Sequence, residues 1–128
     1  MLPSTIISLF RQTTKPDSVI LWLDYDNWNN DNLPYFIKRL KKYGLSVCFC
    51  KDIKSYKKLI PTLEMYPNDL VITCDDDVYY KDDFVQRLVE EYKKDPTRVY
   101  AHRAHRVGRN PDGSLVPYNS WEDELSDV

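Results

Sequence analysis

The chain has 128 residues, of which 42% are hydrophobic and 30% charged, the balance of one ordinary globular domain. The formal net charge of −2 gives no electrostatic case for nucleic acid or an anionic membrane as the main partner. No apolar run approaches the roughly 20 residues that a membrane-spanning helix needs, and no signal peptide is recognisable, so we expect no transmembrane segment.

The cysteines bear on the cellular compartment. There are three, Cys48, Cys50 and Cys74, an odd number without CxxC spacing. This usage is typical of free, buried thiols in a reduced compartment. We therefore expect a cytoplasmic protein without disulfides.

The first part of the chain alternates between helical and strand patterns. Residues 4–12 have apolar side chains at helical spacing, and residues 19–23 form a short apolar run typical of a strand buried on both faces. Residues 33–43 return to helical spacing, with Asn32 as the expected cap. Residues 45–50 are predicted to form the second strand.

The same alternation continues further along the chain. Helical spacing returns at residues 55–66, and residues 70–74 are predicted to form a third strand. Residues 82–93 have the pattern of another helix, and residues 98–101 that of a further strand. From residue 108 on, glycines and prolines predict irregular chain.

Strands that alternate with helices of this length imply βα units and a parallel sheet covered on both faces. The predicted fold class is therefore α/β, with a three-layer α/β/α sandwich around a mainly parallel sheet.

Charged side chains follow each of the three predicted strands. Asp24 follows the first strand, and the run Asp75, Asp76 and Asp77 follows the third. The second strand is followed by charges of both signs: Asp52, Lys54, Lys57 and Lys58. Because ligands bind at the carboxyl ends of strands in open parallel sheets, we expect these groups to converge at one edge.

The aspartate run is predicted to hold a divalent cation. Adjacent carboxylates repel one another. A bound Mg²⁺ or Mn²⁺ ion relieves this repulsion, and such ions are commonly ligated by one or two carboxylates together with substrate phosphates. Asp75 and Asp77 point the same way if strand geometry persists, and Asp76 then faces away or caps the next turn. The alternative is a solvated helix cap, which we prefer for Asp82 and Asp83. For Lys54, Lys57 and Lys58 the alternative is that they form only the solvated face of a helix.

Five blocks of sequence are similar to one known family. In chain order they are SLFRQT (8–13), KPD (15–17), VILWLD (19–24), KDIKSYKKL (51–59) and VITCDDDVYY (71–80). Together they resemble family-2-like inverting glycosyltransferases, and in particular a bacterial subgroup linked to surface-polysaccharide synthesis. The similarity covers roughly residues 2 to 107.

The resemblance implies a GT-A fold, of which this chain has the Rossmann-like nucleotide-binding half, with a nucleotide-sugar donor, most simply a UDP-sugar, and a glycan acceptor. It implies that Asp24 contacts the base and that Asp75 and Asp77 hold Mn²⁺ or Mg²⁺, with Asp77 the stronger candidate. Such a metal acts as a Lewis acid on the departing nucleoside diphosphate. The expected nucleotide-binding residues are Asp24, Asp52, Lys57, Lys58, Asp75 and Asp76.

The chain also departs from the family pattern. The family's first strand has no counterpart, and the catalytic base of inverting members lies well downstream of the aspartates. Glu122 and Asp123 are weak candidates for that base. We therefore expect a domain truncated at both ends, with a nucleotide-sugar-binding part (1–107), a loop-rich tail (108–128) and no sugar transfer by itself.

Two other functions remain open. A non-catalytic α/β association domain would have a solvated acidic loop and an open sheet edge that invites a homodimer. A phosphoryl-transfer enzyme is disfavoured, because the chain has only three glycines and no glycine-rich phosphate loop.

Overall fold

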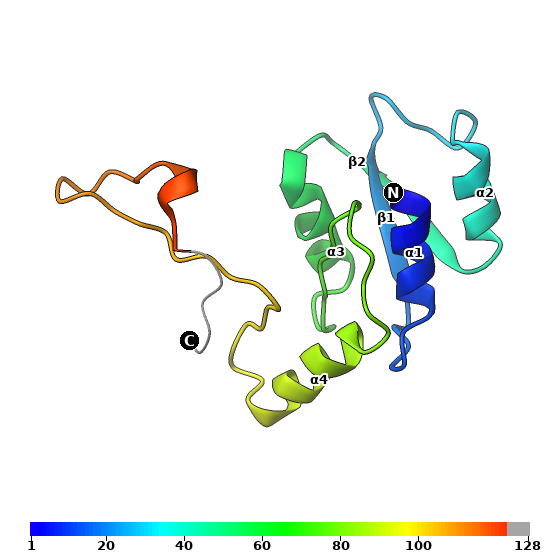
Figure 1. Cartoon of the computed structure of the whole chain (residues 1–128). Helices are drawn as coiled ribbons and strands as arrows, with labels where there is room; N and C mark the ends of the chain where they lie inside the picture. Colours follow the sequence, from blue (N-terminus) through cyan, green and yellow to red (C-terminus); the bar gives the residue numbers. More distant parts are fainter. Residues whose placement is uncertain (123–128) are drawn as a thin grey trace. The chain divides into compact units, whose positions relative to one another are not determined.

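A computed structural model describes residues 1–122, which belong to two compact units, Met1–Arg87 and the chain from Leu88 onward (Figure 1). The boundary falls inside helix α4 (Phe84–Lys94). The division at residues 107 and 108 expected from the resemblance remains a prediction. In the part of the chain that the structure describes, no helix is long and apolar enough to cross a membrane.

The first unit alternates helices and strands. Its elements in chain order are α1 (Leu2–Phe10), β1 (Val19–Asp24), α2 (Tyr35–Lys41), β2 (Leu45–Cys50), the 3₁₀ helix η1 (Lys54–Lys58), α3 (Ile60–Met65) and the start of α4. The two strands pair in parallel, with Val19 opposite Leu45 and Asp24 opposite Cys50. The predicted α/β class and the parallel pairing are therefore confirmed.

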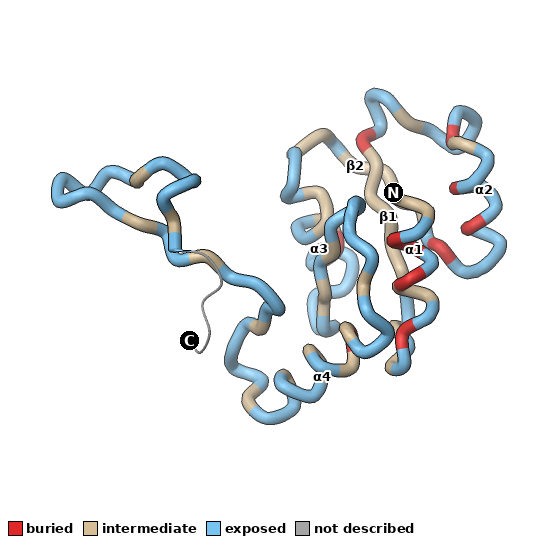
Figure 2. Tube along the Cα trace, in the orientation of Figure 1, coloured by how far each residue is buried: buried red, intermediate tan, exposed pale blue. Residues whose placement is uncertain are grey.

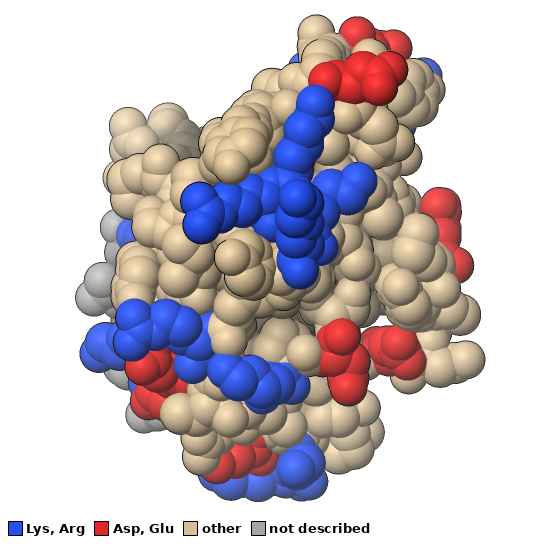
Figure 3. All heavy atoms as spheres, turned by 90° about the vertical axis from the view of Figure 1, so that its right-hand side faces the viewer, with Lys and Arg blue, Asp and Glu red and all other residues tan. Residues whose placement is uncertain are grey.

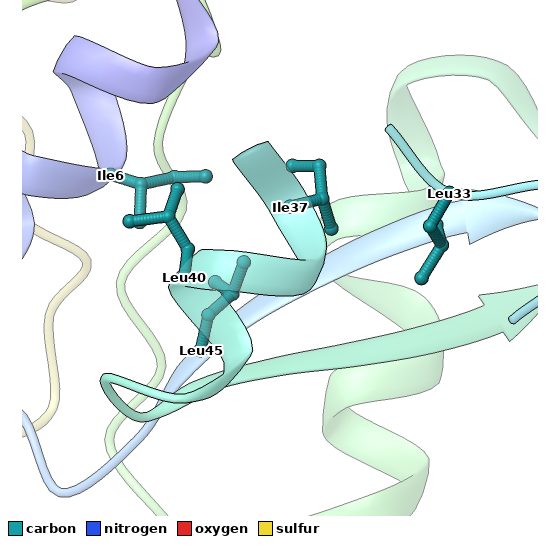
Figure 4. Packing of buried hydrophobic residues seen from close by; sticks show 5 residues of the cluster. All are labelled: Ile6, Leu33, Ile37, Leu40 and Leu45. Carbon is teal, nitrogen blue, oxygen red and sulfur yellow. The ribbon is translucent and has the colours of Figure 1, made fainter. Parts of the chain in front are cut away.

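A hydrophobic core joins α1 and α2 to one face of the sheet. Figure 4 shows its buried members, Ile6, Leu33, Ile37, Leu40 and Leu45. Alternate strand residues pack against this cluster, namely Val19, Leu21, Leu23, Val47 and Phe49. The alternation is the period of two expected of strands. The helices α1 and α2 cover this face of the sheet, and Figure 2 shows buried residues on both of them.

The other face of the sheet is less covered than the sequence predicts. The indole N–H of Trp22 donates a hydrogen bond to Thr62 Oγ1 of α3 at 2.8 Å, and the Cys48 and Cys50 side chains alternate with the core residues of β2. The prediction that β1 is buried on both faces is wrong, because all its residues except Asp24 are only half-buried. All three cysteines are free thiols, and they are half-buried as well.

The predicted third strand does not form. Residues 70–74 have no regular secondary structure, and the sheet of the described chain has two strands, β1 and β2. A strand requires a neighbour for its backbone N–H and C=O groups, and an apolar run does not supply one by itself. Leu70 is 47% exposed, whereas Val71 and Ile72 are half-buried.

Two smaller predictions also fail, and a third is confirmed only in part. Residues 98–101 form no strand, and Val99 is 99% exposed, so this run has no core to pack on. Asn32 does not cap α2, because its side chain bonds the loop at Asn27 and Asn29. The single helix predicted at 55–66 divides into η1 and α3, with Pro61 in the first turn of α3.

Candidate functional site

Carboxylates lie just beyond the ends of both strands. Asp24 ends β1, and the parallel register brings it opposite Cys50, so Asp52 follows at the same edge of the sheet. Lys54 has a positive φ of 55°, which turns the chain sharply between β2 and η1. This turn brings the lysines of η1 back over the strand ends.

Lys57 bridges the two carboxylates. Its Nζ lies 3.0 Å from Asp52 Oδ1 and 3.8 Å from Asp24 Oδ2. Lys54 Nζ contacts the other oxygen, Asp52 Oδ2, at 2.8 Å. Hydrogen bonds from Lys54 and Lys57 hold the pKa of the Asp52 carboxyl far below its ordinary value, and the bond to Asp52 raises the pKa of Lys57.

Lys58, the next residue of η1, forms an ion pair with Asp75 Oδ1. Consecutive lysines of one short helix therefore contact carboxylates from three places in the sequence: Asp24, Asp52 and Asp75. This is the convergence of acid and base that the strand ends predict. The structure confirms the proximity of these groups.

Tyr80 organises the start of the aspartate run. Its hydroxyl accepts a hydrogen bond from the backbone N–H of Asp75 at 2.8 Å and hydrogen-bonds the Cys74 thiol. Its ring packs on Phe84, with 4.3 Å between the centroids. Burial is the main reason that the pKa of Cys74 rises to about 11 and that of Tyr80 to about 12. The sequence analysis assigned Tyr80 no role.

Helix α1 anchors the other end of this segment. Thr5 Oγ1 donates to the Asp76 carbonyl at 3.0 Å, Ser8 Oγ accepts the Tyr80 N–H at 3.1 Å, and Gln12 Nε2 donates to the Lys81 carbonyl at 2.8 Å. Thr5 and Ser8 lie on α1, and Gln12 lies two residues past its end; all three residues are buried. The sequence analysis missed them, although polar residues at this spacing on an otherwise apolar helix were a usable signal.

Asp76 and Asp77 lie in a turn with exposed side chains. The strand geometry that would point Asp75 and Asp77 the same way is therefore absent. Within residues 1–122 no cation pairs with Asp77, and no group of three or more His, Cys, Asp or Glu side chains is placed to hold a metal. A cation at Asp75 and Asp77 requires further oxygen ligands, which substrate phosphates and water supply for Mg²⁺.

Asp24 is more enclosed than the other carboxylates and is 8% exposed. Its Oδ1 accepts hydrogen bonds from the backbone and side-chain nitrogens of Asn27 at 2.9 and 2.6 Å. Oδ2 is the oxygen nearer Lys57. One of its oxygens therefore shapes the loop after β1, which leaves the other to face the lysine.

Of the two weak candidates for a catalytic base, the structure describes Glu122. Glu122 is exposed in the second unit, where its carboxylate pairs with Arg106 at 3.0 Å. Asp123 lies outside the described residues. Neither observation supports a catalytic role for these side chains.

Comparison with protein-family models, curated proteins and solved structures finds no match to this chain. The resemblance to glycosyltransferases is therefore an expectation from the five sequence blocks alone.

Proposed function

We propose that the chain is the donor-binding part of a GT-A-type glycosyltransferase and that it binds a nucleoside diphosphate sugar at the carboxyl ends of β1 and β2. The observation that carries the proposal is the gathering of Asp24, Asp52 and Asp75 around the adjacent lysines Lys57 and Lys58. Parallel strands that end in polar groups are where α/β sheets bind ligands.

The Lys58–Asp75 pair is suited to exchange partners with a diphosphate. The side chains of Lys58 and Asp75 are 40% and 65% exposed, and an exposed ion pair contributes only about 0–1 kcal/mol. A diphosphate offers the lysine a stronger, more highly charged partner. Asp75 is then released and joins Asp77 at a cation that the phosphates also ligate.

The other charged groups have separate roles in this proposal. Lys57 is held by Asp52 and Asp24, so it provides a fixed positive charge beside the phosphates. Asp24 contacts the base through the oxygen that Asn27 does not occupy. Asp52 orients Lys57, and Asp76 holds the turn by accepting the Thr5 hydroxyl at its carbonyl oxygen.

The proposal extends to the fold and the partners. The core helices α1 and α2 cover one face of the sheet, and the Trp22–Thr62 bond attaches α3 to the other, which supports a three-layer sandwich of GT-A type. A UDP-sugar as donor, Mn²⁺ or Mg²⁺ as cofactor, a glycan acceptor in polysaccharide synthesis and a cytoplasmic location are parts of the same proposal.

Calorimetric titration with UDP, with and without Mn²⁺, tests donor binding. We expect binding that requires Mn²⁺ and is lost in Asp77→Ala, because the carboxylate is proposed to ligate the ion. The substitution should leave the fold intact, since the Asp77 side chain is exposed and has no ion pair with the described residues 1–122. Asp17→Ala is the matched control, since Asp17 is also an exposed carboxylate. Equal binding by both variants, or no binding in any condition, would overturn the proposal.

One observation favours the alternative of a non-catalytic association domain. Each strand of the described sheet has a single strand neighbour, so the outer edges of β1 and β2 have no paired strand. Such edges pair with other chains unless they are protected. Sedimentation velocity distinguishes the two functions: this alternative requires a concentration-dependent homodimer and no response to UDP with Mn²⁺.

A further inference from the structure

Charge is strongly segregated in the first unit. Residues 1–16 and 33–51, which include α1 and α2, contain seven of the chain's 18 lysine and arginine residues and none of its 20 carboxylates. The net charge of −2 averages over this difference. A local surface of these helices therefore has a charge opposite in sign to that of the whole chain.

Helix α2 concentrates this positive charge. Its cations, together with the one that follows it, are Lys38, Arg39, Lys41 and Lys42, and all are exposed. Figure 3 faces the α2 side of the first unit and shows a group of lysine and arginine side chains in the centre of the view, with acidic side chains above and below this group. Lys38 and Lys41 contact loop oxygens of Asp31 and Asn30, which are a backbone carbonyl and a side-chain amide.

An apolar groove borders these cations. It has a volume of about 670 Å³ and runs between α1 and α2, with Arg39 among its lining residues. Three of its apolar or aromatic side chains are substantially exposed: Ile7 by 45%, Phe36 by 36% and Tyr43 by 66%. The groove and the cations together form one surface, which we call the α1–α2 face.

We propose that the α1–α2 face docks on an anionic membrane surface. The cations of α2 would contact lipid phosphates, while Ile7, Phe36 and Tyr43 enter the boundary between headgroups and acyl chains. Cations beside exposed aliphatic and aromatic residues, without a carboxylate, are the signature of interfacial membrane binding. This inference does not depend on donor binding at the aspartates.

The composition of the face favours lipid over a protein partner. Three of the four cations on and after α2 are lysines. Lysine is depleted in protein interfaces, whereas flexible lysines suit a fluid layer of phosphates that has no fixed register. The acid-rich remainder of the chain is repelled by the same lipids, so the charge segregation also orients the protein on the surface.

Co-sedimentation with vesicles tests the proposal on the full chain. One set of vesicles is phosphatidylcholine alone, and the other is phosphatidylcholine and phosphatidylglycerol in equal parts. We expect binding to the anionic vesicles only, with the bound fraction falling as salt is added. Equal binding to both lipids, or no binding to either at low salt, would overturn the proposal.

Two variants test the face itself. Lys41→Gln with Lys42→Gln should weaken binding to anionic vesicles about thirtyfold, because each cation near such a surface contributes a factor of about five. Lys81→Gln with Lys93→Gln removes the same charge elsewhere and is the control. Equal losses in the two variants would contradict a specific face.

The apolar side chains have their own variant. Ile7→Ser with Tyr43→Ser should weaken vesicle binding while circular dichroism shows that the helices persist, because both side chains are exposed. Unchanged binding would contradict insertion. Self-association without lipid that the same substitutions abolish would assign the face to a second copy of the chain, and would overturn the membrane proposal.

Discussion

Gln12 Nε2 donates a hydrogen bond to the carbonyl oxygen of Lys81 at 2.8 Å, across 69 residues of sequence. The same side chain accepts the backbone N–H of Val85 through Oε1 at 2.9 Å. Gln12 is fully buried, so it replaces water at both backbone groups. The segment that follows the aspartates is therefore positioned by polar contacts to Gln12, two residues past the end of α1.

Replacing Gln12 with leucine should lower the free energy of unfolding by about 2–4 kcal/mol. The change leaves the buried Val85 N–H and the part-buried Lys81 carbonyl without their partner; a buried, unsatisfied group costs about 1–3 kcal/mol, and the part-buried one adds less. Urea unfolding measures the difference. Arg11→Ala is the control, because an exposed side chain next to Gln12 should change stability by at most about 0.5 kcal/mol. A loss for Gln12→Leu no larger than that of the control contradicts this role.

Substituting Lys54 or Lys57 by glutamine should raise the pKa of the Asp52 carboxyl toward its ordinary value of 3.8. The lysines lower the pKa in the folded chain, so their contacts stabilise the fold above the ordinary value. That contribution is lost as the pH falls through the lower, folded value. A carbon-13 NMR titration of the aspartate carboxyls reports the change. Lys51→Gln should leave the pKa of Asp52 where it is, and an equal rise there would argue against the contacts.

Cys74 should resist alkylation in the folded chain. With a pKa of about 11, about one molecule in a thousand carries the reactive thiolate at pH 8. Tyr80→Phe should slow the reaction further, because the tyrosine hydroxyl stabilises the thiolate. Mass spectrometry after iodoacetamide treatment gives the rate for each cysteine, with the urea-unfolded chain as the reference. Equal rates for folded and unfolded Cys74 would show that the thiol is not shielded.

Much of the first unit could be predicted from the sequence, because hydrophobic periodicity is a local property. It indicates α1, β1, α2, β2 and α4 to within a few residues. The apolar run at 70–74 misled the prediction, since such a run indicates burial and says nothing about a partner for the backbone. In the run at 98–101 even the prediction of burial is wrong for Val99, whose side chain is exposed.

The candidate site was predictable only in outline. The parallel register places the ends of β1 and β2 together, so the convergence of Asp24, Asp52 and the lysines follows from the order of elements. The pairing of Lys58 with Asp75 depends on a turn whose geometry a local pattern does not specify. The same is true of the contacts of Tyr80 with α1, which join positions far apart in the sequence.

The position of a bound Mn²⁺ is the most direct test of the proposed donor site. Paramagnetic broadening of backbone amide signals by a small amount of Mn²⁺, recorded with and without UDP, locates the ion. We predict that signals of residues 75–78 broaden first, that this requires UDP, and that Asp77→Ala removes the effect. Broadening that is independent of UDP, or that is equally strong at an unrelated exposed carboxylate such as Asp17, would contradict it.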